Sequence, residues 1–437
     1  MPILSRKIRV AVQGCSHGSL DAVYAALQKL EAKTGAVDFL LMCGDFQAVR
    51  NRQDLDTLHC PQKYRRMGDF SKYYSGLTKA PVLTVFIGGN HEAASHMWEL
   101  YHGGWVAPNI YYMGHAGVIR VGDLRIGGVS GIHSDSDAAL GYEPLDAYGR
   151  RGSIRRVSDG VVMDQHIRSR LSAAYHTRQW EIERLLQLQT SLVCADTSSE
   201  LDIFLSHEWP HSIYEHGNAG KLLERKPFFR SDLAQSGKGI GSKPLALLLS
   251  RLKPRNWYAG HMHVDFEARV THTGLVSDKK GEFSPVISQV LESETRFVAL
   301  DKCLPGRAHL KIFEIHPSAG TARGRAGKQG VELKTKDEVR VEYDPEWLSI
   351  VRAYNPYMPL GRDPVRFPST AELRLEEHRQ FVREYVTELS LEIPGRWRAP
   401  SYQRGQETSL TQTAALCKML DMKDYWNPDS KCSELVT

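Results

Sequence analysis

The chain has 437 residues, of which 41% are hydrophobic and 24% are charged. Because one hydrophobic core rarely fills a chain of this length, we expect a catalytic domain with a smaller appended unit, and the ordinary composition excludes a chain that is disordered throughout. The net charge of +5 permits a polyanionic partner without requiring one.

The cysteines and the N-terminal residues bear on the cellular compartment. Seven cysteines at irregular spacing fit a reducing compartment better than a disulfide framework. Residues 1–7 carry basic side chains, but no apolar run long enough for a signal peptide follows them, and no later segment is apolar enough to cross a bilayer. We therefore expect a soluble, intracellular protein with no membrane partner.

The N-terminal segment predicts a strand, a turn and a helix. Apolar residues over Lys7–Gln13 predict a short buried strand that ends at Gly14, where a polar turn begins. A helix is predicted after this turn, because apolar residues then recur at three- and four-residue steps until Gly35, namely Leu20, Val23, Tyr24, Leu27 and Leu30.

Further buried strands are predicted, and each delivers polar residues at its C-terminal end. Residues 39–42 precede Gly44-Asp45, residues 81–87 precede Gly-Gly-Asn-His-Glu, residues 203–206 precede His207, and residues 257–260 precede His-Met-His. Ligands of open α/β sheets gather at the carboxyl ends of the strands. We therefore expect these segments to converge on one site.

Two stretches lack a regular apolar pattern. Residues 132–170 are rich in Asp, Ser, Gly and Arg, and we expect them to form a long surface loop. Residues 317–336 have the composition of a flexible linker or hairpin tip. The arginines of the first stretch form either a solvated face or a contact with a phosphate backbone, namely Arg150, Arg151, Arg155 and Arg156.

The C-terminal unit is predicted to be mostly helical. Residues 369–389 begin with a capping serine and early acidic residues, and an apolar stripe follows at Leu373, Phe381, Tyr385, Val386 and Leu389. A second, shorter helical signal covers residues 416–426. These helices are expected to brace the catalytic domain, to recruit a partner, or to do both.

Side chains at the predicted strand ends form a pattern typical of a two-metal centre. An isolated histidine at a strand end is more often a structural residue than a ligand. Five independent segments in this order are far more specific, and they give as candidate ligands Cys15, His17, Asp45, Asn90, His207, His261 and His263.

The chemistry of phosphodiester hydrolysis explains these residue types. Two divalent cations about 3.5–4 Å apart can neutralise a phosphate and activate water near neutral pH. Asp45 suits a bridging position, because a carboxylate can offer one oxygen to each ion. His91 directly follows Asn90, and we assign it as the general acid that protonates the leaving oxygen, with Glu92 expected to orient it. A purely structural role for His91 is the alternative.

These segments resemble the calcineurin-like metallophosphoesterase superfamily, whose pattern opens with Asp-x-His where this chain has Cys15-Ser16-His17. Within that superfamily, the Cys-x-His form followed by Gly-Asp-Phe-Gln-Ala-Val-Arg-Asn over residues 44–51 resembles the RNA lariat debranching enzymes. The resemblance extends from about Arg9 to Val351, with further matching segments at residues 73–76, 104–112, 205–210 and 299–305.

The resemblance implies an α/β fold, namely a metallophosphoesterase α/β/β/α sandwich with a mostly helical C-terminal extension. The expected units are a catalytic domain over residues 1–316 with a recognition-loop insertion at about 132–178, a linker or hairpin over 317–336, and a C-terminal debranching-enzyme domain over 337–437. The implied reaction is hydrolysis of the 2′–5′ phosphodiester bond at the branch point of excised intron lariats, which gives linear RNA for turnover.

The family pattern also implies roles for individual residues. One metal ion would be held by Cys15, His17, Asp45 and His263, and the other by Asp45, Asn90, His207 and His261, with His91 as the catalytic acid. The end of the family's recognition loop resembles Tyr175, His176 and Arg178, which would contact RNA. A buried tyrosine and a surface arginine are the structural alternative for these three positions.

The cysteine ligand favours iron(II) and zinc(II), with manganese(II) as a further candidate, because a thiolate is a softer ligand than a carboxylate. The implied partners are branched RNA and spliceosome-associated proteins, and the implied location is the nucleus, with shuttling to the cytoplasm. The sequence does not determine the oligomeric state.

Other functions fit the sequence less well. The main alternative is another binuclear-metal phosphodiesterase that acts on nucleotides or DNA. A protein Ser/Thr phosphatase is disfavoured because Gly44-Asp45 does not continue through Val-Asp-Arg-Gly. A scaffold that has lost catalysis is disfavoured because every expected ligand position is filled.

Overall fold

The computed structural model describes residues 7–143, 155–157, 160–162, 165–188, 200–234, 239–274, 291–318, 340–386, 391, 393 and 409–426. Its strands are β1 (Ile8–Gln13), β2 (Phe39–Met42), β3 (Leu83–Phe86), β4 (Gly104–Ala107), β5 (Ile110–Tyr112), β6 (Ala116–Val121), β7 (Leu124–Val129), β8 (Ile132–His133), β9 (Arg155–Val157), β10 (Gly160–Val162), β11 (His176–Thr177), β12 (Ile203–Ser206), β13 (Asn256–Ala259), β14 (Phe266–Gly274), β15 (Leu291–Ala299), β16 (Leu310–Ile315) and β17 (Val341–Tyr343). Its helices are α1 (Leu20–Thr34), α2 (Arg52–Asp56), η1 (Gln62–Tyr64), α3 (Phe70–Tyr74), α4 (Ala94–Glu99), α6 (Gln165–Ala174), α7 (Gln179–Leu186), η3 (Ile213–His216), α8 (Ala219–Arg225), α9 (Phe229–Ala234), α10 (Lys243–Leu252), α12 (Pro345–Tyr354), η5 (Asn355–Tyr357), α13 (Thr370–Leu373), α14 (Leu375–Tyr385) and α16 (Ser409–Met419).

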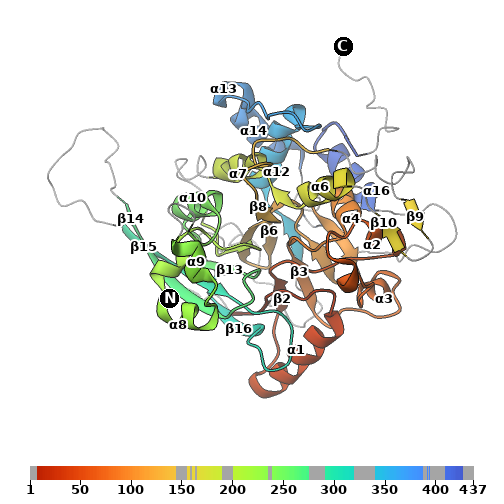
Figure 1. The fold of residues 1–437 in the computed structure, drawn as a ribbon. Coiled ribbons are helices and arrows are strands. Elements are labelled where there is room, and N and C mark those ends of the chain that lie inside the picture. The colour runs from red at the N-terminus through yellow and green to blue at the C-terminus, as the bar shows by residue number, and fades with distance from the viewer. Residues whose placement is uncertain are drawn as a thin grey trace, which may run out of the picture.

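Most of the described strands form two mixed sheets (Figure 1). The first sheet has the order β16-β1-β2-β3-β5-β4, and its inner strands from β1 to β5 run parallel. The second has the order β14-β15-β13-β12-β7-β6-β17, with the parallel run from β15 to β7 at its centre. The predicted α/β class is therefore confirmed.

Alternate side chains of the strands are buried on opposite faces. In β1, Val10 and Val12 belong to the hydrophobic cluster between the two sheets, where they join residues of the second sheet such as Ile126 and Leu205. Ala11 belongs instead to a cluster with Leu27 and its neighbours on α1. Since the face of a strand alternates with each residue, these short apolar runs fill two interfaces at once.

A third cluster covers the outer face of the second sheet. It joins α7, α10 and α12 to that sheet through residues such as Trp180, Leu248 and Ile350. Helix α1 lies against the first sheet, at the lower edge of Figure 1, and α7, α10 and α12 lie on the other side. The layer order is therefore helix, sheet, sheet, helix, as the family resemblance implied.

The predicted strand ends agree with the structure. Strands β2 and β12 have the predicted bounds, and β1, β3 and β13 differ from the prediction by one or two residues at an end. Helix α1 also begins at the predicted Leu20 and ends before Gly35, whose backbone N–H donates to Glu31. Among the described residues, no helix combines the length and the apolar character that crossing a membrane needs.

The expectation of one long surface loop over residues 132–170 is wrong for part of that stretch. Strand β8 begins it and pairs with β11, while β9 pairs with β10, and α6 begins at Gln165. The backbone of β8 is held by pairing with a distant segment, which local composition does not report. Arg150 and Arg151 lie outside the described residues, and the side chains of Arg155 and Arg156 are not described.

The C-terminal helical prediction holds with two corrections. The described part of residues 369–389 forms two helices rather than one, because Arg374 adopts φ 44° between α13 and α14. Tyr385 is 67% exposed, so it does not belong to the buried stripe. Ser369 caps α13 as predicted, and α16 ends at Met419, earlier than expected. Leu389 lies outside the described residues, as does most of the predicted linker over residues 317–336.

The C-terminal residues are built into the catalytic fold. Strand β17 pairs with β6 at the edge of the second sheet. Asp344 then caps α12 by accepting from the backbone N–H of Trp347 at 3.1 Å. Its carboxylate also accepts two bonds of 2.9 Å from Arg125 of β7 and one of 3.2 Å from Arg120 of β6. This ion pair therefore joins the C-terminal unit to the second sheet.

The Arg125–Asp344 pair is buried, with side-chain exposures of 2% and 0%. Burial alone would raise the pKa of Asp344, but the charges of Arg125 and Arg120 outweigh it and lower the pKa to about 2. A carboxyl whose pKa is lower in the folded state stabilises the fold above its unfolded pKa. That stabilisation is present above about pH 4 and is lost as the pH falls towards 2.

We predict that Asp344→Asn lowers the free energy of unfolding at pH 7 by about 3 kcal/mol, because it leaves the buried Arg125 without its counter-charge. Urea titrations measure this change, and the difference from the parent protein should narrow as the pH falls below 4. The exposed pair Lys7–Glu314 provides the control. Glu314→Gln should change the stability far less, because this exposed pair is screened by solvent, and an equal effect of the two substitutions would contradict the prediction.

Candidate metal centre

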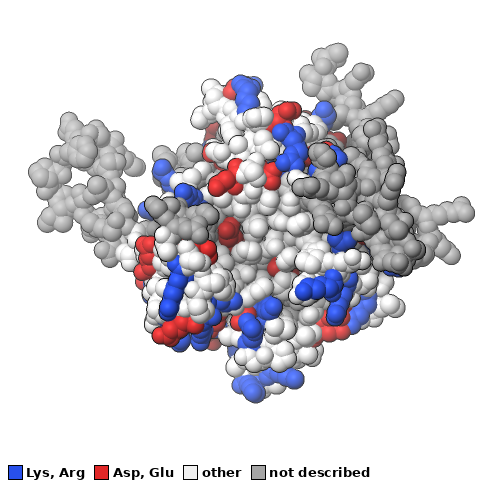
Figure 2. Space-filling view, in the orientation of Figure 1, with Lys and Arg blue, Asp and Glu red and all other residues white. Residues whose placement is uncertain are grey.

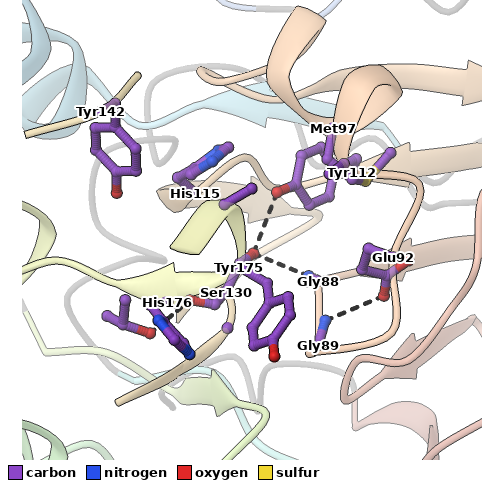
Figure 3. Close-up of a pocket in the computed structure, with 14 residues that line it drawn as sticks. Gly88, Gly89, Glu92, Met97, Tyr112, His115, Ser130, Tyr142, Tyr175 and His176 are labelled. Carbon is purple, nitrogen blue, oxygen red and sulfur yellow. Dashed lines mark hydrogen bonds between the residues drawn. The ribbon is translucent and has the colours of Figure 1, made fainter. Parts of the chain in front are cut away.

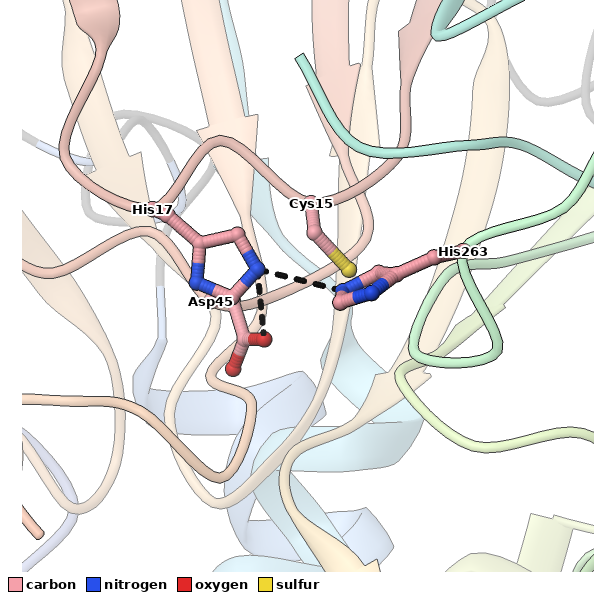
Figure 4. Close-up of side chains that lie close together, drawn as sticks. All are labelled: Cys15, His17, Asp45 and His263. Carbon is pink, nitrogen blue, oxygen red and sulfur yellow. Dashed lines mark hydrogen bonds and ion pairs between the residues drawn. The ribbon is translucent and has the colours of Figure 1, made fainter. Parts of the chain in front are cut away.

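Four of the predicted ligands meet at the carboxyl ends of the strands. The ligand atoms of this group all lie within 4.8 Å of one another, and the residues are Cys15, His17, Asp45 and His263. They come from the loops after β1, β2 and β13, and Figure 4 shows their side chains pointing towards one another. Cys15 and Asp45 are buried, and the two histidines are partly exposed.

The donor set of this group fits a cation. The Nε2 atoms of His17 and His263 lie 3.1 Å apart, and Nε2 of His17 lies 3.5 Å from a carboxylate oxygen of Asp45. Nitrogen lone pairs and a carboxylate that face one another repel unless a proton or a positive ion lies among them. Imidazole, carboxylate and thiolate are ligands of zinc and of iron.

A second group forms on the other side of Asp45. The other carboxylate oxygen, Oδ1, lies 3.3 Å from Nε2 of His207, which lies 3.1 Å from the side-chain oxygen of Asn90. The ring of His261 lies with its centroid 4.9 Å from that of His207. All seven predicted ligand residues therefore converge, and Asp45 presents one oxygen to each group.

Hydrogen bonds from the backbone orient these ligands. The Nδ1 atom of His207 lies 2.7 Å from the carbonyl oxygen of Cys43, which can only accept, so Nδ1 carries the proton and Nε2 is left for a metal. The backbone N–H of His261 donates to the sulfur of Cys15 at 3.1 Å. The backbone N–H of His91 donates to Oδ1 of Asp45 at 2.9 Å. The loops that carry the ligands thus hold one another in place.

The backbone at four ligand positions is left-handed. His17, Asp45, His261 and His263 have φ values of 47°, 49°, 61° and 48°. Non-glycine residues rarely adopt this conformation, and each instance costs on the order of 1 kcal/mol. Its repetition at these positions indicates that the sharp turns are needed to direct the side chains into one place.

Glycines let the loops approach closely. A Cβ atom on Gly89 would lie 2.3 Å from Oδ1 of Asp45 and 2.8 Å from Cε1 of His207. A Cβ atom on Gly44 would lie 2.4 Å from Nδ1 of His207, and Gly44 also has φ 94°. Any side chain at either position would push the ligands apart, so these glycines are part of the centre.

Charges and burial are also consistent with bound cations. Burial alone would raise the pKa of Asp45, but the neighbouring histidines, with His207 first, lower it well below its usual range. Burial and the charge of Asp45 raise the pKa of the Cys15 thiol well above its usual value. A buried thiolate beside a carboxylate needs a positive ion to stabilise it. Burial lowers the pKa of His261 to about 3 and that of His263 to about 4, so both rings are neutral at pH 7.

His91 lies beside the centre, with its ring centroid 5.6 Å from that of His17. Its Nδ1 atom lies 3.1 Å from the carbonyl oxygen of His59, which fixes the proton on Nδ1 and leaves Nε2 for a substrate. The expectation that Glu92 orients His91 is not what the structure shows. The carboxylate of Glu92 accepts from the backbone N–H groups of Phe46, Gln47 and Gly89 at 2.7, 2.7 and 3.0 Å, so it braces the ligand loops instead.

Figure 3 shows a pocket beside this brace. It is lined by the Gly88–Gly89 turn and Glu92 on one side and by two predicted RNA contacts, Tyr175 and His176, on the other. The hydroxyl of Tyr175 lies 3.1 Å from Nδ1 of His59, and Nδ1 of His176 lies 2.6 Å from a carboxylate oxygen of Asp137. Both side chains are partly exposed near the centre, and their contact with RNA stays a prediction.

Arg178 is buried, although both interpretations of the sequence, an RNA contact and a surface arginine, placed it at the surface. Its side chain is 2% exposed, and its guanidinium donates to the carbonyl oxygens of His176 and Ala173 at 3.1 and 2.9 Å. The guanidinium carbon also lies 5.1 Å from the ring centroid of Tyr142. In this conformation Arg178 supports the turn that carries Tyr175 and His176.

Sequence reasoning missed two residues that orient the site, His59 and Cys43. Both act through a backbone carbonyl oxygen. Because every residue carries such an oxygen, residue type gives no signal for this role.

Comparisons with known proteins agree with this geometry. The family model described as calcineurin-like phosphoesterase matches residues 8–265, and the model described as lariat debranching enzyme, C-terminal domain, matches residues 292–425. A lariat debranching enzyme of Arabidopsis thaliana is 39% identical over 383 residues, which cover 87% of this chain and 76% of the relative. That of Homo sapiens is 43% identical over 349 residues, 79% of this chain and 54% of the relative. That of Drosophila melanogaster is 41% identical over 372 residues, 80% of this chain and 61% of the relative.

The two family models divide the chain differently from the predicted units. The C-terminal model begins at residue 292, in β15, rather than at residue 337. Strands β15 and β16 belong to the two sheets, so the C-terminal model begins within the sandwich rather than after it. The chain spans just over half of the human relative and three quarters of the plant relative.

The backbone of Gly89 lies so close to Asp45 that a side chain at this position should disturb metal binding. We expect Gly89→Ala to weaken metal binding by about 10- to 100-fold, because the added methyl group would displace the carboxylate of Asp45. Elemental analysis of the purified protein and a titration with a chelator measure this loss. Gly220→Ala in α8 is the matched control, because the nearest atom to a Cβ there is a side-chain oxygen 3.6 Å away. Full metal content in Gly89→Ala would show that the turn does not determine the position of Asp45.

Proposed function

The chain belongs to the lariat debranching enzyme family of calcineurin-like phosphoesterases, and we propose that it hydrolyses the 2′–5′ phosphodiester bond at the branch point of excised intron lariats, giving linear RNA for turnover. Enzymes of this superfamily are metal-dependent phosphoesterases, and divalent metal ions are implied by the family and by the ligand cluster. The substrate follows from the names of the relatives and from the match of both family models.

The observation that carries the proposal is the convergence of seven candidate ligands, with Asp45 between the two groups and His91 beside them. The ions supply positive charge to a phosphate and lower the pKa of bound water. Cys15 and Asp45 are the anionic ligands, so a centre with two divalent ions keeps a net positive charge for the substrate. The side chains of His207, His261 and Asn90 would add no negative charge to this centre.

Hydrolysis needs a proton at the leaving oxygen. An oxygen of water bonds to phosphorus while the bond from phosphorus to the 2′ oxygen breaks, and the branch nucleotide departs with a free 2′ hydroxyl. As an imidazolium, His91 suits the donation of that proton, because its Nδ1–H donates to the carbonyl oxygen of His59 while its Nε2–H faces the leaving oxygen, and the ring is left neutral after the transfer. The brace by Glu92 keeps the loop of Asp45 and the turn of Gly89 at a fixed separation during the reaction.

The test of this function is a comparison of substrates. We expect the metal-loaded enzyme to cleave a synthetic branched RNA at its 2′–5′ bond and to leave linear RNA of the same sequence intact. Hydrolysis of DNA or of a cyclic nucleotide with a kcat/KM equal to that for branched RNA would favour the alternative, another binuclear-metal phosphodiesterase.

The role of His91 is tested by comparing two substrates whose leaving groups differ in their need for a proton. His91→Ala should lower kcat for branched RNA by about 100- to 10,000-fold, because a sugar alkoxide needs a proton to depart. The loss for bis(p-nitrophenyl) phosphate should be far smaller, since p-nitrophenolate departs without one. Metal content measured in parallel should be unchanged. Equal losses for both substrates would instead support the structural role for His91.

We propose iron(II) and zinc(II) as the ions, because the soft sulfur of Cys15 and the imidazoles favour them over manganese(II). Cys15→Asp should therefore shift the preference of the first site towards manganese(II). Competition between zinc(II) and manganese(II), followed by elemental analysis, measures the shift, and Cys43→Ser, at a buried cysteine whose carbonyl rather than its sulfur contacts His207, is the control. An unchanged ratio of bound metals would mean that the sulfur does not set the selectivity.

The proposed reaction also suggests where the protein acts. Because excised introns arise in the nucleus, we propose nuclear residence with some shuttling to the cytoplasm, and contacts with spliceosome-associated proteins. Imaging of the tagged protein and recovery of its bound partners would test both proposals.

A further inference from the structure

An exposed aromatic side chain lies among basic residues at the turn η1 and the residues after it. Tyr64 is 62% exposed, and Lys63 and Arg66 on either side are also exposed. The ammonium nitrogen of Lys63 lies 4.8 Å from the centroid of the Tyr64 ring. Figure 2 shows Lys and Arg side chains gathered over the region of α2 and α3, the helices that flank this turn in the chain. We call residues 59–69 the basic turn segment.

Both ends of the basic turn segment rest on loops of the metal centre. At its start, the carbonyl oxygen of His59 contacts Nδ1 of His91 at 3.1 Å. At its end, the backbone N–H of Asp69 donates at 2.9 Å to the carbonyl oxygen of Gly18, which follows the ligand His17. Tyr64 is the fifth residue after His59, so its backbone lies within about 17 Å of that anchor. The segment that carries the exposed side chains is therefore anchored at both ends to the reaction site.

The turn is held in shape by its own hydrogen bonds. The backbone N–H of Tyr64 donates to Pro61 at 2.9 Å, and that of Arg65 donates to Gln62 at 3.0 Å. The guanidinium of Arg65 also donates to the carbonyl oxygen of Cys60 at 3.4 Å. A turn that is already ordered loses little conformational entropy when a ligand binds to it. Its exposed aromatic ring and cations are thus presented in a fixed arrangement.

An aromatic face between cations matches one kind of ligand well. Bases of a single-stranded nucleic acid stack on exposed tyrosine rings, and the adjacent phosphates contact Lys and Arg. We propose that the basic turn segment binds single-stranded RNA next to the scissile bond, with Tyr64 stacking on a base and with Lys63 and Arg66 contacting phosphates. This inference rests on the proposed function for the identity of the substrate.

The position of the segment also assigns the strand that it binds. His59 contacts His91, the residue proposed to protonate the departing 2′ oxygen. That oxygen stays on the branch nucleotide. The basic turn segment therefore binds the strand that contains the branch nucleotide, rather than the arm whose 5′ phosphate is attacked.

The binding experiment uses the metal-loaded enzyme and a fluorescent branched RNA in which a methylene group replaces the bridging 2′ oxygen, so that hydrolysis cannot occur. Tyr64→Ala should weaken binding by about 5- to 150-fold in anisotropy titrations. Tyr64→Phe should bind as the parent protein does, because it retains the aromatic face. The control is Tyr385→Ala in α14, which removes a tyrosine that is 67% exposed.

The contribution of Lys63 and Arg66 is tested by measuring how RNA binding depends on salt concentration. Lys63→Gln together with Arg66→Gln should reduce the slope of log Kd against log salt concentration by about 1.4, or about 0.7 for each phosphate that the variant no longer neutralises. Lys29→Gln with Lys33→Gln removes two exposed lysines from α1 and should leave the slope unchanged. Equal effects of the two double variants would mean that the turn contributes only to the general charge of the protein, which would overturn the proposal.

Shortened RNAs test the assignment of the strand. The effect of Tyr64→Ala should vanish when the nucleotides flanking the branch nucleotide are removed, and it should persist when the other arm is shortened. An effect that follows the other arm would overturn this assignment. Stronger competition by poly(glutamate) than by RNA would identify an acidic protein as the ligand instead.

Hydrolysis separates this inference from the proposed function. If the parent enzyme binds the branched RNA through Tyr64 but does not cleave the natural 2′–5′ bond, the proposed function fails and the binding surface stands. If the parent enzyme cleaves that bond and Tyr64→Ala binds the RNA normally, the binding surface fails and the proposed function stands.

Discussion

The carboxylate of Asp45 is the group on which the rest of the site depends. It is buried, it presents one oxygen to His17 and the other to His207, and it accepts a hydrogen bond from the backbone of His91. A buried charge is costly unless opposite charge compensates it. Burial lowers the pKa values of His261 and His263, so these rings supply little positive charge. Burial alone would lower the pKa of His207 as well, but Asp45 raises it, and a divalent ion would replace the proton of that ring as the counter-charge. Asp45 would thus contribute one oxygen to each group of ligands and help to place the ions between them.

The two-sheet sandwich provides the rigid frame that this carboxylate needs. Apolar side chains fill both faces of the short parallel strands, which fixes the strands and leaves only their carboxyl ends to carry polar residues. The loops there are forced into left-handed conformations at His17, Asp45, His261 and His263. Such conformations persist only where the surrounding structure holds them. The strain in the loops is therefore balanced by the packing of the core.

Supports outside the ligand set connect catalysis to recognition. The segment from His59 holds the ring of His91 and also contacts Tyr175, a residue predicted to touch RNA. Arg178 in turn supports the backbone around Tyr175. A substrate that contacts Tyr175 or the basic turn segment would thus contact the residues that orient His91. The C-terminal unit contributes at a greater distance, because Asp344 ties α12 to the second sheet through Arg125.

The sequence by itself determined the strand ends and the candidate ligands. Apolar runs that stop at polar residues give the bounds of β2 and β12, and the combination of Cys15, Asp45, Asn90 and the histidines is rare enough to indicate a two-metal centre. These features are local, so residue type and spacing report them. The tertiary structure decided what depends on contacts between distant segments: the burial of Arg178, the brace by Glu92, the hold of the His59 carbonyl on His91, and the pairing of β8 with β11. Backbone groups make most of these contacts, and because every residue has the same backbone groups, only the folded chain shows which of them meet.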